Sequence, residues 1–142
     1  YVSIFKNSKI TGVTRYGEAG PGPKGSVMIV TCQLGGQEFT ALNGGPQFTF
    51  TEAVSFVANC ETQAEVDDLW EKRSEGGEQA QCGWLKDKYG LSWQVVPTVL
   101  VKLLNDPDPG KSRRVMQAML QMKKIDIKTL QEASGCVENP RR

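Results

Sequence analysis

The 142-residue sequence contains no histidine. Without an imidazole, the chain can form no Ser-His-Asp triad and has no histidine for general acid–base catalysis. The same absence argues against a Cys/His zinc site, and it leaves no histidine to activate a cysteine nucleophile. Several of the commonest catalytic arrangements are therefore excluded before any motif is considered.

Long apolar runs and paired cysteines are also missing. No apolar run approaches the roughly 20 residues that a membrane-spanning helix needs, and the residues after Tyr1 lack the pattern of a signal peptide. No two of the cysteines form a CxxC pair, and all but the last lie in apolar, strand-like stretches, where a free thiol behaves as a small hydrophobic group. They are Cys32, Cys60, Cys82 and Cys136. We therefore expect a protein of the reducing cytoplasm.

Charge of either sign is not in excess. Lys and Arg number 17 against 16 Asp and Glu, which gives a formal net charge of +1. We therefore expect no nucleic-acid partner and no attraction to an anionic membrane. The content of 39% hydrophobic and 23% charged residues is ordinary for a soluble globular protein.

The order of apolar patterns and turns predicts a mixed chain, with strands and helices before Pro97 and helices after it. Thr62 followed by Glu65 predicts a helix start with a capping box. The helix that follows is predicted to turn a stripe of side chains inward, in which Arg73 buries only its stem. The stripe is Val66, Leu69, Trp70 and Arg73. The other predicted elements are a helix tail at Tyr1, Ile4 and Phe5, a strand at 10–16, a Gly/Pro-rich loop at 17–25, a hairpin of 26–34 with 37–43, a strand at 53–60, and a hairpin at 82–97.

After Pro97 the pattern becomes helical. Thr98 and Asp126 are predicted helix caps, and Asp108 with Pro109 predicts a further helix start. We expect the last helix to end near Gly135. These helices either close a ligand cleft or pack on a partner subunit, and the sequence leaves both alternatives open.

An internal repeat organises the rest. A helix followed by a hairpin occurs twice, which predicts a strand-helix-strand-strand-strand (βαβββ) unit used twice. The first copy begins within its helix, so we expect its first strand and part of that helix to precede Tyr1. The predicted organisation is a first module at 1–50, a second at 51–97, a helical segment at 98–135 and a tail at 136–142.

Four stretches of the chain resemble the PhnB-like branch of the vicinal oxygen chelate (glyoxalase/bleomycin resistance) superfamily, whose members often carry the label 3-demethylubiquinone-9 3-methyltransferase. They are "YVSIFKNSKI", "FTALNGGPQFTFTEAVSFVANCETQAEVDDLWEKRSEGG", "CGWLKDKYGLSWQVVP" and "RRVMQAMLQMKKIDIKTL". The resemblance implies an α+β fold of the glyoxalase/dihydroxybiphenyl dioxygenase type. In this fold two βαβββ modules form a curved mixed sheet with a cleft, here followed by C-terminal helices. It also implies a homodimer.

The resemblance further implies where a metal would be held. Metal-using members place a carboxylate near the end of each module's last strand, where this chain has Gln94 and, in the first module, Thr40; the first-strand ligand falls near Ala53. Hard cations favour several oxygen donors that include carboxylates, and Glu38 is the carboxylate that shares a strand face with Thr40. We therefore expect no metal and no cofactor. The alternative is a metal-dependent lyase, isomerase or dioxygenase that takes a ligand from the preceding strand or from a dimer partner.

Strand alternation separates a mixed polar face from an apolar one. Ser92 and Gln94 lie on one side of their strand, and Trp93 lies on the other. A cleft with a few converging polar groups suits a small organic ligand of unidentified structure, although such a face is also compatible with solvent or a subunit interface. The candidate ligand-binding residues are Glu38, Thr40, Ser55, Ser92 and Gln94, with Trp84 either an aromatic wall or a core residue.

The methyltransferase label calls for an S-adenosylmethionine site, and the candidate is "GEAGPGPKG" at 17–25. Glycine-rich cofactor loops open a helix and direct backbone N–H groups at the ligand. Here Pro21 and Pro23 have no N–H group, and a strand follows. We therefore interpret this segment as a mobile connection, and the residues do not support the label.

Overall fold

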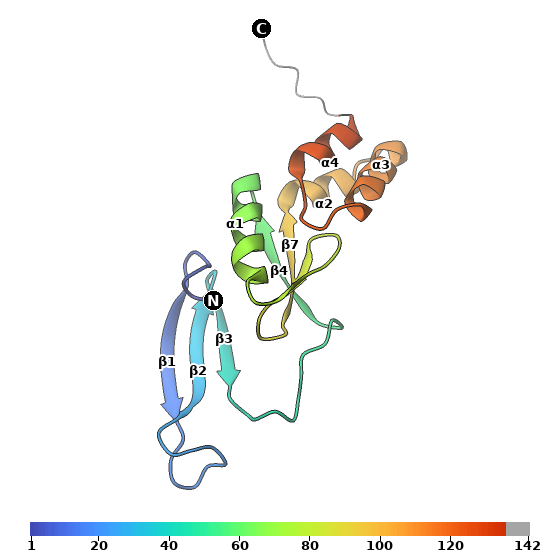
Figure 1. Ribbon diagram of the computed structural model, residues 1–142. Coiled ribbons are helices and arrows are strands. Elements are labelled where there is room, and N and C mark those ends of the chain that lie inside the picture. The colour runs from blue at the N-terminus through green and yellow to red at the C-terminus, as the bar shows by residue number, and fades with distance from the viewer. Residues whose placement is uncertain (136–142) are drawn as a thin grey trace. The chain divides into compact units, whose positions relative to one another are not determined.

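The computed structural model describes residues 1–135, so the predicted tail and Cys136 lie outside the described residues. The chain divides into two compact units, Tyr1–Thr49 and Phe50–Arg142. The described chain contains both strands and helices, and the α+β class is confirmed (Figure 1).

The first unit is an antiparallel sheet in the order β1-β2-β3. Its strands are β1 (Lys9–Arg15), β2 (Val27–Leu34) and β3 (Gln37–Leu42), close to the predicted bounds. The β2–β3 turn has φ of +57° at Gly35 and +87° at Gly36. Left-handed backbone at both central positions is what a tight two-residue hairpin needs, and glycine adopts it without steric cost.

Residues 1–7 are turns, so the predicted helix tail is wrong for them. The N–H groups of Ile4 and Phe5 both donate to the Tyr1 carbonyl, at 2.9 and 3.2 Å, which makes a single turn. Asn7 then adopts a φ of +50°, and its carbonyl accepts from Gly36 N–H at 3.1 Å. One turn gains too few hydrogen bonds to offset helix nucleation, and the left-handed residue ends it.

The loop between β1 and β2 packs around the side chain of Tyr16, which is buried. The Tyr16 hydroxyl donates to the Asn43 carbonyl at 2.5 Å. A Cβ atom on Gly20 or Gly22 would lie only 2.6 or 2.5 Å from atoms of the Tyr16 ring. The glycines are thus required by close contact with an aromatic ring. The segment therefore packs around Tyr16, and its interpretation as a mobile connection stays a prediction.

The second unit contains the predicted βαβββ order followed by three helices. A mixed sheet runs in the order β4-β7-β6-β5, in which β4 and β7 are parallel and the other pairs are antiparallel. Its elements are β4 (Ser55–Cys60), α1 (Gln63–Ser74), β5 (Glu78–Gln79), β6 (Trp84–Lys86) and β7 (Ser92–Pro97). The two-residue strand β5 is too short to give a periodic signal in the sequence.

Helix α1 contacts β4, β6 and β7 and covers one face of this sheet (Figure 1). As predicted, the Thr62 hydroxyl accepts from Glu65 N–H at 3.2 Å, and the Glu65 carboxylate reaches back to accept from Glu61 N–H at 2.8 Å. Val66 and Trp70 are buried. Arg73 is only 8% exposed, so the prediction that it buries its stem alone is wrong; the whole residue is covered.

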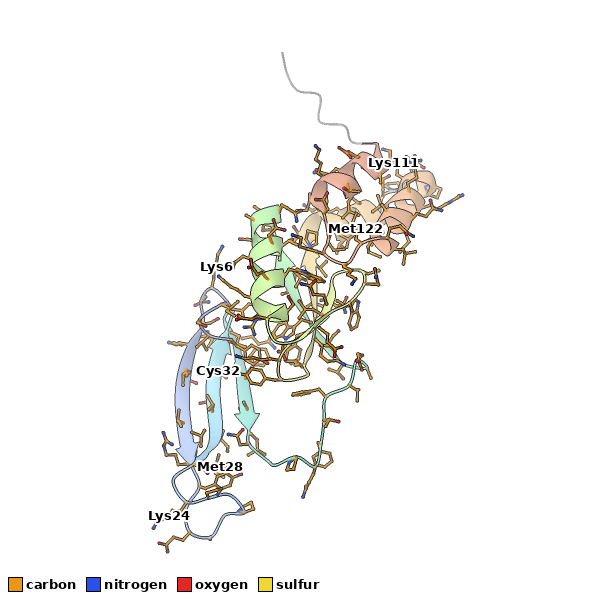
Figure 2. All side chains as sticks on the ribbon, in the orientation of Figure 1. Lys6, Lys24, Met28, Cys32, Lys111 and Met122 are labelled. Carbon is orange, nitrogen blue, oxygen red and sulfur yellow. The ribbon has the colours of Figure 1, made fainter. Side chains whose placement is uncertain are left out.

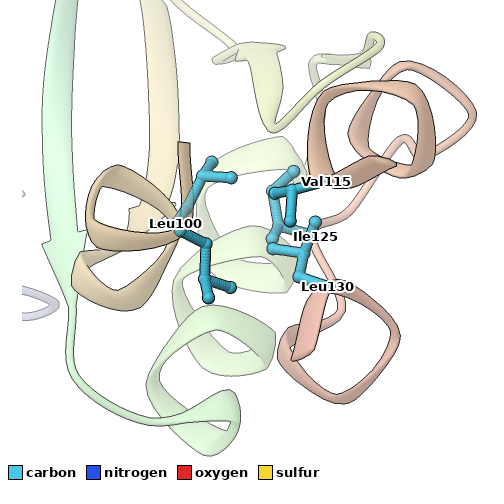
Figure 3. Packing of buried hydrophobic residues seen from close by; sticks show 5 residues of the cluster. Leu100, Val115, Ile125 and Leu130 are labelled. Atoms are coloured by element: carbon cyan, nitrogen blue, oxygen red, sulfur yellow. The ribbon is translucent and has the colours of Figure 1, made fainter. Parts of the chain in front are cut away.

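The helices α2 (Thr98–Leu104), α3 (Pro109–Leu120) and α4 (Ile127–Ser134) share a small hydrophobic core (Figure 3). The caps Asp108 and Asp126 are confirmed, since each accepts a backbone N–H of its helix, and Gly135 ends α4 with a φ of +83°. Thr98 is not the cap of α2: Pro97 takes that position, and the Thr98 hydroxyl donates to Glu61 at 2.9 Å. The core residues are Leu100, Leu103, Val115, Ile125 and Leu130.

This helical segment is joined to the sheet of the second unit. Cys82 N–H donates to the carbonyl of Met122, which is labelled in Figure 2, at 2.8 Å. Gln63 of α1 bonds the backbone of Ile125 and Ile127 through its amide, at 3.1 and 2.8 Å. The helices therefore belong to the same unit as the second sheet. Among the described residues, none of the helices has both the length and the apolar character that crossing a bilayer requires.

Candidate functional site

The register of the second sheet places four of the predicted site residues on one face. Ser55 pairs with Ser92 across β4 and β7, and Trp84 pairs with Gln94 across β6 and β7. Directly paired residues point to the same side of a sheet. We call this side the polar sheet face, defined by Ser55, Val57, Trp84, Lys86, Ser92 and Gln94.

The opposite face of the sheet is apolar and buried. Trp93 is 5% exposed and Val95 is 0% exposed, on the side that packs toward α1. The Trp93 ring meets Phe56 edge to face, with ring centroids 5.4 Å apart. The sequence prediction that Trp93 and Gln94 serve opposite faces is therefore confirmed, and Trp84, which pairs with Gln94, lies on the polar side.

Asp87 holds the hairpin that presents this face, and its role was not predicted from the sequence. Its carboxylate is buried, and one oxygen accepts from the N–H groups of Tyr89 and Leu91, at 2.9 and 3.1 Å. The other oxygen accepts from the indole N–H of Trp93 at 2.9 Å. An aspartate that opens a turn and bonds the backbone two residues on is a recognisable signal, so "DKYG" could have indicated it.

The centre of the polar sheet face is a side-chain hydrogen bond. The Gln94 amide donates to the Ser55 hydroxyl oxygen at 3.0 Å, and both residues are half-buried. Ser92 lies beside them in the register and is 2% exposed. The chemistry at this point is that of a neutral amide and hydroxyls.

Charge on this face is concentrated at Lys86. Its ammonium group lies 2.5 Å from the carboxylate of Glu52. This hydrogen bond lowers the pKa of Glu52 and raises the pKa of Lys86, so each group holds the other in its charged form. The place of Lys86 on this face could have been predicted from the sequence, because it lies two residues from Trp84 on the same strand. The place of Glu52 could not, because it precedes β4 in irregular chain.

Glu38 and Thr40 lie in the first unit, on β3. They are exposed and pair with Gln33 and Thr31 of β2, so they share one face of the first sheet as predicted. The structure thus brings the candidates together in two groups, one per unit. That both groups line a single cleft stays a prediction.

The residues at the positions expected for metal ligands do not fit a hard divalent cation. Thr40 offers an exposed hydroxyl, Ala53 has no donor atom, and the Gln94 amide is neutral and bonded to Ser55. Within the part of the chain that the structure describes, no group of three or more His, Cys, Asp or Glu side chains could hold a metal ion. S-adenosylmethionine fits no better at 17–25, because Gly20 and Gly22 there pack against the Tyr16 ring.

The described cysteines give no activated nucleophile. Cys32, Cys60 and Cys82 are free thiols, and Cys60 is completely buried. Desolvation, with smaller contributions from Glu65 and Glu61, raises the pKa of Cys60 to about 11. At neutral pH this thiol stays protonated, and the interpretation of Cys60 as a small hydrophobic residue is confirmed.

These features define an α+β protein with a βαβββ unit and a neutral, hydrogen-bonded amide on the sheet face away from α1. Residues 1–96 match the sequence model of the family described as 3-demethylubiquinone-9 3-methyltransferase, and the chain belongs to this family. The predicted PhnB-like membership is thereby confirmed.

Solved structures agree with this assignment. A Bacillus cereus PhnB protein, provisionally named 3-demethylubiquinone-9 3-methyltransferase, is 38% identical with a TM-score of 0.64, over 69% of this chain and 85% of that chain. The protein PA1353 from Pseudomonas aeruginosa is 20% identical with a TM-score of 0.51, over 63% of this chain and 77% of its own. The second likeness supports the fold alone. No curated protein is significantly similar to the chain.

Proposed function

We propose that this PhnB-like protein binds a small organic molecule on the polar sheet face and does so without a divalent metal. The observation that carries the proposal is the hydrogen bond between Gln94 and Ser55, at the position where the resemblance implies a metal-binding carboxylate. Ser92 and Trp84 share that face. A few polar groups beside an aromatic surface are typical of small-molecule sites.

The binding proposal is tested with full-length protein labelled with fluorotryptophan. The chain has three tryptophans, so fluorine NMR gives few resonances, and Trp84→Phe identifies the one from the polar sheet face. The probes are benzamide, benzoate and benzamidine, which share a ring and differ in charge. We expect at least one to shift the Trp84 resonance saturably while the buried Trp70 and Trp93 resonances stay in place. No saturable shift with any of the three would contradict the proposal.

The metal-free part of the proposal has its own measurement. Elemental analysis of the full-length protein, purified without chelators, should find far less than stoichiometric divalent metal. Stoichiometric metal that disappears in Glu38→Ala or Gln94→Ala would instead support metal-dependent lyase, isomerase or dioxygenase chemistry. We do not propose the methyltransferase activity of the family description, because Gly20 and Gly22 of the candidate segment at 17–25 pack against the Tyr16 ring.

We also propose that the protein is a cytoplasmic homodimer. The free thiols of the described cysteines support a reducing location. The dimer is supported by the first sheet, where Ile10 and Val13 are 56% and 50% exposed and pair with Cys32 and Val30 on the face opposite Glu38 and Thr40. An exposed apolar sheet face of this kind is typical of protein interfaces.

A further inference from the structure

We propose that the polar sheet face takes a neutral, planar ligand that carries a carboxamide-like group, with a hydrogen-bond donor and an acceptor side by side. This inference rests on the proposed function and specifies the chemical class of the ligand. It depends on the hydrogen bonding of Gln94 and Ser55, the pairing of nearby charges, and the position of Trp84.

The hydrogen-bonding capacity of the Gln94–Ser55 pair is complementary to such a group. A glutamine amide has two N–H donors and one carbonyl acceptor, and one N–H is used by the Ser55 oxygen at 3.0 Å. The carbonyl of Gln94 remains as an acceptor, while its second N–H and the Ser55 hydroxyl proton remain as donors. If the amide is turned by 180°, Ser55 donates to the carbonyl and both N–H groups are left, and the carbonyl keeps its second lone pair. In either orientation the pair presents a donor and an acceptor together.

The charges nearby do not favour an anionic ligand. Lys86 is the cation of the polar sheet face, and its ammonium group is paired with Glu52 at 2.5 Å. Glu78 pairs with Lys86 in the register of β5 and β6, so a second carboxylate is on the same side. A ligand carboxylate or phosphate would therefore have to compete with carboxylates already in place. Gln94 and Ser55 themselves carry no charge that would recognise a cation.

Trp84 supplies the planar surface. It is half-buried and lies directly opposite Gln94 in the antiparallel register. Side chains so paired have Cβ atoms about 4.5–5.5 Å apart, which is within reach of one ring-sized ligand. A ring stacked on the indole would place its carboxamide substituent against the Gln94–Ser55 pair.

The test uses the labelled full-length protein and the same three probes. We expect benzamide to bind at least about tenfold more tightly than benzoate or benzamidine, since a mismatched ligand leaves a donor or acceptor unpaired. In Gln94→Glu, benzamide affinity should fall about tenfold and benzamidine affinity should rise, because the new carboxylate accepts from an amidinium. The matched control is Gln117→Glu on the exposed side of α3, which should change neither affinity.

The outcomes separate this inference from the proposed function. If benzoate or benzamidine shifts the Trp84 resonance more strongly than benzamide does, the ligand class is wrong and small-molecule binding stands. If benzamide binds equally well to Gln94→Glu, the role of the amide is overturned. Ser55→Ala provides a second variant for the case in which Gln94→Glu fails to fold, and unchanged benzamide affinity there would also overturn the inference. If no probe shifts Trp84, both proposals fail.

Discussion

Asp87 offers the sharpest test of how the hairpin holds the polar sheet face. Its carboxylate accepts three N–H groups, from Tyr89, Leu91 and the Trp93 indole, at 2.9, 3.1 and 2.9 Å. Tyr89 is 62% exposed, so water can replace the carboxylate at its N–H. Leu91 and Trp93 are 7% and 5% exposed, and their N–H donors would lose the carboxylate in buried surroundings.

The magnitude follows from those two donors. Each buried donor left without a partner costs about 1–3 kcal/mol, so we expect Asp87→Ala, which affects two such donors, to lower the free energy of unfolding by about 2–6 kcal/mol. In Asp87→Asn the remaining oxygen can keep both backbone N–H groups, because one oxygen accepts both now. The new NH2 group then faces the Trp93 indole N–H, and two donors cannot bond to each other. We therefore expect Asp87→Asn to lower the free energy of unfolding by about 1–2 kcal/mol.

Urea unfolding followed by tryptophan fluorescence measures these changes, since all three tryptophans lie in the second unit. The control is Asp68→Asn, which alters an exposed ion pair with Lys72 on α1 and should stay within about 0.5 kcal/mol of the unmodified protein. Trp93→Phe combined with Asp87→Asn should show coupling, because the lost bond joins these two side chains. If Asp87→Asn unfolds like the unmodified chain, the carboxylate does not hold the hairpin as argued.

Three further predictions concern the first unit and the family name. Gly22→Ala should destabilise the first unit by about 1–3 kcal/mol, because its Cβ would lie 2.5 Å from the Tyr16 ring. The control is Gly17→Ala, whose Cβ would meet nothing within 4 Å and which should be neutral. Hydrogen exchange of the β1 and β2 amides distinguishes the two variants. Light scattering should show a dimer that Val13→Glu weakens and Thr14→Glu, on the opposite face, leaves intact; equal effects would contradict the proposed interface. Calorimetry of the full-length protein with S-adenosylmethionine should show no binding, and saturable micromolar binding would refute our interpretation of residues 17–25.

Features set by short-range chemistry could be predicted from the sequence. The alternation of Trp93 and Gln94 follows from the two-residue period of a strand, and the caps Asp108 and Asp126 follow from side chains that bond the first turn of their own helix. Thr98 was wrongly predicted to be the cap of α2 from the same kind of side-chain signal. Pro97 still belongs to β7 but takes the cap position of α2, which moves the threonine into the helix.

Features set by contacts across the fold could not be predicted in this way. The glycines at 20 and 22 are explained by the ring of Tyr16, which only the folded loop brings over them. Glu52 reaches Lys86 from irregular chain, where no periodicity assigns it a direction. Glu38 and Thr40 belong to one face of their own sheet, but alternation along a strand carries no information on how two units pair.

This chain has Gln94 where the family resemblance implies a carboxylate. The difference alters what the polar sheet face can recognise more than it alters the fold. A glutamate there would carry a charge that must be balanced by a cation, a donor or water when half-buried. Glutamine fills nearly the same volume, is neutral, and satisfies one of its own donors on Ser55. The carboxylate of Glu52 cannot take over the role without cost, because it is already paired with Lys86. The face is thereby left with both acceptors and donors, which is why we propose a neutral ligand there in place of a metal ion.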